Sequence, residues 1–81
     1  MNKRDIFKEN VSSELRALRG RFNLTQKEVA NKADIDIMTV TRYENNTTSM
    51  QLDMLQKILS VYDVDIAIFF NNIYANMQNN N

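Results

Sequence analysis

Three side chains near the middle of the chain share a helical spacing and an ability to pack or hydrogen-bond: Met38, Arg42 and Asn45. Positions i, i+4 and i+7 lie on one face of an α-helix, and Val40 and Tyr43 would lie on the opposite face. The Met thioether can pack against apolar groups, the Arg guanidinium can donate hydrogen bonds, and the Asn amide can donate and accept them, all without breaking a covalent bond. The chemistry that this face indicates is therefore recognition of a partner.

Two residue types that often carry catalysis or bind metals are missing from the sequence. Its 81 residues include neither His nor Cys, which removes the commonest general base, the commonest metal ligand and any thiolate site. There is no phosphate-binding glycine loop and no pair of carboxylates in an apolar setting. We expect no enzymatic activity, no catalytic residue, no metal site and no cofactor.

Length and composition indicate one helical domain with a small core. Apolar residues make up 43% of the chain, and one Gly with no Pro suits helices joined by short connections. The longest apolar run, residues 66–70, is far shorter than the roughly 20 residues that cross a bilayer, and the N-terminus lacks the apolar core of a secretory signal. A soluble cytoplasmic domain without a membrane partner is expected.

The chain has no net charge, but its two halves differ in sign. Residues 1–42 hold nine Lys or Arg against six Asp or Glu, a net charge of +3, and residues 43–81 hold one against four, a net charge of −3. This division suits a molecule with one face toward an anion, although an ordinary scatter of surface charge would give the same numbers.

Two short helices joined by a tight turn are predicted to hold the recognition face. The sequence Thr-Gln-Lys-Glu at residues 25–28 is a capping box, in which Thr25 and Glu28 each accept from the other's backbone amide. In the turn, we expect Asp34 to adopt a left-handed or otherwise tight conformation and Ile35 to fill the core between the helices. Asp36 then caps a third helix that ends at residue 44 or 45.

Apolar stripes predict further helices on both sides of this pair. The N-terminal stripe is Phe7, Val11, Leu15, Leu18 and Phe22, and the C-terminal one is Leu52, Leu55, Ile58 and Leu59. Residues 64–77 fit both a helix and an alternating strand, and the helix is favoured because its match is longer and Asp65 can cap it. We expect an arm or first-helix start at 1–10, the domain at 11–70, and an extension at 71–81 whose polar end, Gln78 to Asn81, is disordered.

The order of these motifs resembles the Cro/phage-repressor (XRE) helix-turn-helix family from about residue 11 to residue 70. The marks that carry the resemblance are Leu24-Thr25-Gln26, Val29-Ala30, Val40-Thr41-Arg42-Tyr43-Glu44-Asn45, Leu52, Leu55, Ile58, Val64 and Phe69-Phe70. The resemblance implies an all-α, five-helix lambda-repressor-like DNA-binding domain with a C-terminal apolar helical extension. The family prefers Gly at four turns where this chain has Asn23, Asp34, Asn46 and Asp63, the residue types that best replace Gly at positive φ.

The resemblance also implies a function, a sequence-specific transcriptional regulator that binds an inverted-repeat operator in double-stranded DNA as a homodimer. The third helix would enter the major groove, with Arg42 facing guanine and with Ile37 and Met38 facing thymine methyl groups. The DNA-binding residues that it implies are Thr25, Gln26, Ile37, Met38, Thr39, Thr41, Arg42, Asn45, Thr47 and Thr48.

Two structural contacts complete the expectations. By resemblance, Arg19 forms a salt bridge with Glu44. The surplus of apolar residues in the last segment predicts a dimer interface at Ile68, Ile73, Tyr74 and Met77, although the segment could instead fold back over the core of its own chain. Two alternatives stay open: the antitoxin of a toxin–antitoxin pair with autoregulatory DNA binding, whose protein partner would be a toxin, and a protein-interaction module on the same fold.

Overall fold

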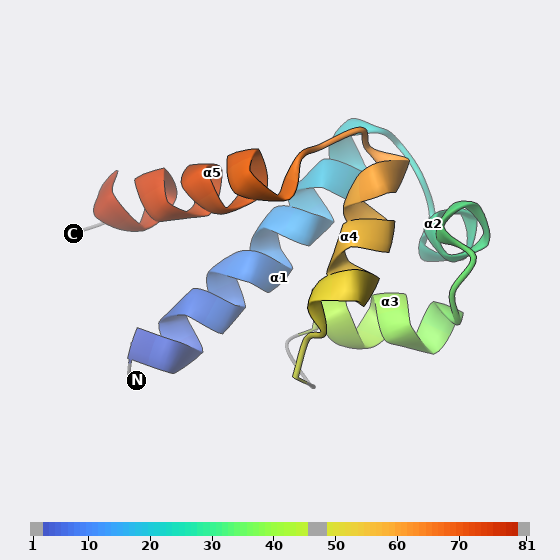
Figure 1. The fold of residues 1–81 in the computed structure, drawn as a ribbon, viewed down its shortest axis with the longest axis horizontal. Helices are drawn as coiled ribbons and strands as arrows, with labels where there is room; N and C mark the ends of the chain where they lie inside the picture. The colour runs from blue at the N-terminus through green and yellow to red at the C-terminus, as the bar shows by residue number, and fades with distance from the viewer. Residues whose placement is uncertain (1–2, 46–48, 80–81) are drawn as a thin grey trace.

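The computed structural model describes residues 3–45 and 49–79, and every regular element in these ranges is a helix (Figure 1). The helices are α1 (Lys3–Arg21), α2 (Gln26–Ala33), α3 (Ile37–Glu44), α4 (Leu52–Val61) and α5 (Ile66–Asn79). Helix α2 packs on α3 and α4, whereas α1 packs on α3 and α5. Helix α1 thus joins the α2–α3 pair on one side of the molecule to α5 on the other.

Side-chain caps begin α2, α3 and α5 at the residues that the sequence predicts. The capping box of α2 is complete, with 3.1 Å from the Glu28 nitrogen to Thr25 Oγ1 and 2.8 Å from the Thr25 nitrogen to Glu28 Oε1. Asp36 Oδ1 accepts from the Met38 amide at 2.7 Å, and Asp65 caps α5 through the Ala67 amide at 2.7 Å. The last 14-residue segment is therefore a helix, as favoured above, and not a strand.

Three helices end on a left-handed Asn or Asp, which confirms three of the four predicted substitutes for Gly. Asn23, Asp34 and Asp63 have φ values of 55°, 58° and 56°. The residue after each one donates its backbone N–H to a carbonyl in the last helical turn, as Ile35 does to Ala30 at 3.0 Å. Asn46, the fourth position, lies outside the described residues.

The core is built from one face of each helix around the middle of α1. Its members are Val11, Leu15, Leu18, Val29, Ala30, Val40, Tyr43, Leu55, Ile58, Leu59, Tyr62, Phe69 and Ile73. Leu24, Ile35, Val64 and Phe70 are partly buried against this cluster. Ile35 thus occupies the place between α2 and α3 that was expected of it.

The ends of the predicted apolar stripes are more exposed than their spacing suggests. Leu52 is 67% exposed, because it is the first residue of α4 and the core begins one turn later at Leu55. Phe7 and Phe22 are also exposed, although Phe7 stacks on Phe70 and the Phe22 ring lies 5.1 Å from that of Tyr62. A stripe on a helix therefore overstates the core near the ends of that helix.

Helix α5 corrects two expectations about the last segment. Ile73, assigned above to a dimer interface, is almost fully buried within this chain, because the face of α5 that contains it packs on α1. Gln78 and Asn79 are helical and do not belong to a disordered tail, whereas residues 80–81 lie outside the description. None of the described helices is by itself long and apolar enough to cross a bilayer; α4 and α5 meet that test only as a pair, bent by 93°.

Candidate nucleic-acid interface

Helix α3 has one face inside the molecule and one outside. Val40, Tyr43 and Glu44 are buried, which fixes the helix against α1 and α2. On the other face Ile37 is 41% exposed and Met38 is 50% exposed. The burial of α3 therefore follows the inner and outer faces expected from the sequence.

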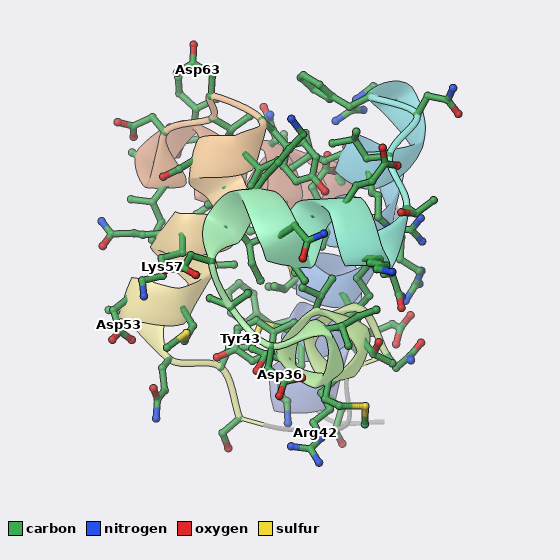
Figure 2. The ribbon with its side chains drawn as sticks, turned by 90° about the vertical axis from the view of Figure 1, so that its right-hand side faces the viewer. Asp36, Arg42, Tyr43, Asp53, Lys57 and Asp63 are labelled. Atoms are coloured by element: carbon green, nitrogen blue, oxygen red, sulfur yellow. The ribbon has the colours of Figure 1, made fainter. Side chains whose placement is uncertain are left out.

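Two polar residues extend this outer face toward the end of α3. Arg42 and Asn45 are exposed, and Figure 2 shows Arg42 pointing away from the body of the protein. Thr39 is partly buried on the same short helix. The structure thus brings these side chains together with Ile37 and Met38, while Thr47 and Thr48 lie outside the described residues.

Gln26, at the start of α2, is engaged by side chains of α3. Its Oε1 accepts from Thr41 Oγ1 at 2.8 Å, and its Nε2 donates to Glu44 Oε1 at 3.1 Å. The resemblance implies a DNA contact for each of Gln26 and Thr41, but nothing in the sequence indicates that the two side chains contact one another. Their mutual bond forms where α2 packs on α3, and the small side chains of Ala30 and Ala33 are buried on α2.

The predicted ion pair between Arg19 and Glu44 is present at the centre of this contact. Arg19 Nε lies 3.0 Å from Glu44 Oε1 and 2.9 Å from Oε2, and Arg19 Nη1 donates to the Leu24 carbonyl at 3.0 Å. Glu44 is 3% exposed, so its carboxylate depends on these donors for the hydrogen bonds that water would otherwise supply.

Two further bonds tie the backbone at the end of α3 to α1. Ser12 Oγ donates to the Tyr43 carbonyl at 2.7 Å, and Arg16 Nη1 donates to the Glu44 carbonyl. Both carbonyls belong to the last turn of α3, where they have no partner within the helix. Sequence reasoning missed both residues, although the position of Ser12 beside Val11 on the buried side of α1 was a usable signal.

The start of α4 borders the same surface. Gln51 is the N-cap residue of α4 but makes no side-chain cap bond; instead, its backbone amide donates to the Tyr43 hydroxyl at 2.9 Å. A shallow polar depression of about 230 Å³ lies beside it, lined by Thr39, Arg42, Tyr43, Ser49, Gln51 and Met54. The depression places hydroxyl and amide groups next to Arg42.

Electrostatics around the face are mixed. Asp34 and Asp36 are exposed beside the α2–α3 turn, although Asp36 is already an acceptor in the α3 cap. Hydrogen bonds from the Thr25 backbone and hydroxyl lower the pKa of Glu28, because both favour the ionised carboxylate. Behind the face, burial and the nearby Glu44 charge raise the pKa of Tyr62 to about 12.

Comparison with known proteins decides the family. The family model described as "Helix-turn-helix" matches residues 15–69, about two thirds of the chain. The chain belongs to this helix-turn-helix family. The match covers the last seven residues of α1, all of α2, α3 and α4, and the start of α5, so the exposed face of α3 lies within it.

One curated relative and two solved structures extend the comparison. Over 56 residues the chain is 39% identical to the transcriptional repressor RstR of the cryptic phage CTXphi from Vibrio cholerae, a match that covers 69% of this chain and 50% of RstR. The chain thus spans about half the length of that relative.

The solved structures share the fold at low sequence identity. The wild-type restriction-modification controller protein C.Esp1396I is 21% identical with a TM-score of 0.80, and the match covers 89% of this chain and 95% of that one. The C.Esp1396I tetramer in complex with its natural 35 base-pair operator gives 22% identity and a TM-score of 0.77, covering 85% of this chain and 91% of that one. At such identity the likeness establishes the all-α fold alone.

Proposed function

We propose that this protein is a sequence-specific DNA-binding transcriptional regulator, a repressor that places α3 in the major groove of its operator. The observation that carries the proposal is the outer face of α3, where Ile37 and Met38 are exposed beside Arg42 on a helix fixed from behind. Large apolar side chains at a rigid, exposed helix face indicate contact with a partner. A helix of this kind, preceded by a second helix across a short turn, fits the major groove.

The comparisons support a DNA partner. RstR is named a transcriptional repressor, and C.Esp1396I was solved as a tetramer on its 35 base-pair operator. By analogy, this chain acts by binding DNA in the cytoplasm and not by catalysis.

The chemistry of the face predicts which base edges it reads. The Arg42 guanidinium can donate two hydrogen bonds to O6 and N7 of guanine, which discriminates against other bases by about 1–3 kcal/mol. Ile37 and Met38 have no side-chain donor, but they can pack against thymine methyl groups. We expect Thr25, Gln26, Thr39 and Asn45 to contact the phosphate backbone, because such contacts set the register of a recognition helix. We infer a half-site with a guanine next to thymines.

Self-association is required for useful affinity, because phosphate contacts supply much of the binding energy and this chain has no net charge. Two copies on half-sites one helical turn apart would double the contacts. The outer side of α5 offers a surface for a homodimer: Ile68 and Tyr74 are exposed, and the helix contains no charged residue. Met77 is partly buried against the core, and Ile73 is almost fully buried and is excluded from this surface.

Selection from a random duplex library at low salt, about 50 mM, tests the proposal directly. We expect enrichment of an inverted repeat, and Arg42→Ala should weaken binding to it by about 10- to 100-fold and relax the preference at one base pair per half-site. Lys57→Ala is the matched control, because it removes one positive charge from α4, away from Arg42 (Figure 2). Failure to enrich any sequence, or equal losses from both variants, would contradict the proposal.

A further inference from the structure

The bonds around Gln26 fix which of its atoms can meet DNA. A carboxylate only accepts hydrogen bonds, so Glu44 requires the amide nitrogen of Gln26 to face it. The amide oxygen must then face Thr41, whose hydroxyl donates to it at 2.8 Å. The orientation of the Gln26 amide, which is ambiguous for most exposed Gln side chains, is therefore determined by Glu44.

The same bonds determine which hydrogen-bond donors and acceptors of Gln26 and Thr41 remain available to a ligand. The Gln26 amide nitrogen carries two hydrogens and donates one to Glu44, and no described residue accepts the second. The Thr41 hydroxyl has given its only hydrogen to Gln26 and retains just lone pairs. A phosphate oxygen accepts and does not donate, so of these two side chains only Gln26 can bond to it while the network is intact.

We propose that Thr41 and Glu44 are positioning residues that present the second Gln26 N–H to a backbone phosphate, and that Thr41 does not contact the DNA itself. The inference rests on the proposed function and deepens it, because it names the donor and the residues that aim it. Arg19 completes the arrangement by holding the Glu44 carboxylate through its Nε. Orientation by a packed network lowers the ordering cost of the contact when DNA binds.

A double-mutant cycle in affinity for the selected operator tests this assignment. Gln26→Met removes the donor with little change in shape, and Thr41→Val removes the hydroxyl that orients it. We expect about a tenfold loss for Gln26→Met, as for a hydrogen bond to a charged group, and a loss of about three- to tenfold for Thr41→Val. In the Gln26→Met background, Thr41→Val should change affinity by less than about twofold.

Two further variants separate positioning from other roles. Thr41→Ser keeps the hydroxyl and should bind within about twofold of the unmodified chain. Thr39→Val is a matched Thr-to-Val change on the same helix. It should change operator affinity by the same factor whether residue 26 is Gln or Met. All affinities are measured below the unfolding range of each variant, so a loss of folded protein cannot produce the coupling.

Each outcome of the cycle decides the assignment. An equal loss of operator affinity from Thr41→Val with Gln26 and with Met at position 26 would mean that Thr41 binds DNA independently of Gln26. No loss of affinity in either background would mean that Thr41 does not orient Gln26. Both results overturn the inference while the proposed function stands. If the unmodified chain binds no duplex, the proposed function fails and this inference fails with it.

Discussion

Removal of Arg19 should destabilise the fold far more than removal of a neighbouring arginine with a similar ion pair. Arg19 pairs with Glu44 at 2.9 Å, and Arg21 pairs with Glu14 at 3.0 Å. The Arg19 side chain is 26% exposed and its partner 3%, whereas the Arg21 side chain is 60% exposed and its partner 12%. The same change, Arg→Met, therefore compares a buried pair, in which Arg19 contacts both oxygens of Glu44, with a more exposed pair that has a single contact.

The expected cost follows from what Arg19→Met leaves behind. Glu44 would remain buried with one side-chain donor, Gln26 Nε2, and the Leu24 carbonyl would lose its bond from Arg19. Breaking one half of a buried pair typically costs about 3–5 kcal/mol. Because Arg19 is partly exposed, water can reach the vacated space, and we expect the lower end, about 3 kcal/mol. Arg21→Met should cost at most about 1 kcal/mol, as for surface pairs.

Thermal and urea unfolding followed by circular dichroism measure these costs. For a domain of this size about 3 kcal/mol corresponds to a loss of about 12–24 °C in Tm. Adding Glu44→Gln to Arg19→Met replaces the unpaired carboxylate with an amide and should restore about 1–2 kcal/mol. Equal destabilisation by Arg19→Met and Arg21→Met, or no recovery in the double variant, would refute the reasoning.

Two further predictions concern α5 and Tyr62. Ile68→Asp should convert the proposed homodimer to a monomer, as measured by light scattering. Gln56→Asp adds the same charge to an exposed site on α4 and should leave the dimer intact. A dimer that survives Ile68→Asp excludes this interface. The buried Tyr62 hydroxyl has no bonding partner among the described residues, so Tyr62→Phe should stabilise the fold by about 1 kcal/mol. Folding raises the pKa of Tyr62 from 10.0 to about 12, so the folded state favours the neutral hydroxyl over the phenolate. The free energy of unfolding is therefore unaffected by this group below pH 10, and it falls as the pH rises from 10 to 12. Tyr62→Phe should remove this part of the alkaline loss, and an unchanged stability profile between pH 10 and 12 would contradict the assignment.

The features that the sequence predicts best are those decided by residues a few positions apart. The capping box of Thr25 and Glu28 needs only its own turn of helix. The left-handed ends at Asn23, Asp34 and Asp63 likewise follow from local sterics, because Asn and Asp tolerate positive φ better than most residues. Both kinds of feature are therefore readable without knowledge of how the helices pack.

The features that the sequence does not predict depend on how the helices pack against one another. Helix α5 is apolar over much of its circumference, so its period could not decide whether Ile73 or Ile68 faces α1. The spacing of Gln26 and Thr41, 15 residues apart, likewise gives no sign that they form a hydrogen bond. Such contacts depend on the angle and distance at which two helices pack, and periodicity within one helix does not contain that information.

The Arg19–Glu44 pair links the stability of this fold to its proposed recognition of DNA. If its only role were to stabilise, a well-packed apolar pair would serve as well or better. A carboxylate in this place has a second effect, because it accepts from Gln26 and so fixes the polarity of the amide at the start of α2. An apolar replacement of both residues should therefore retain the fold and weaken DNA binding, since Gln26 could then turn its oxygen toward a phosphate. On this argument the ion pair orients a binding residue at least as much as it stabilises the domain.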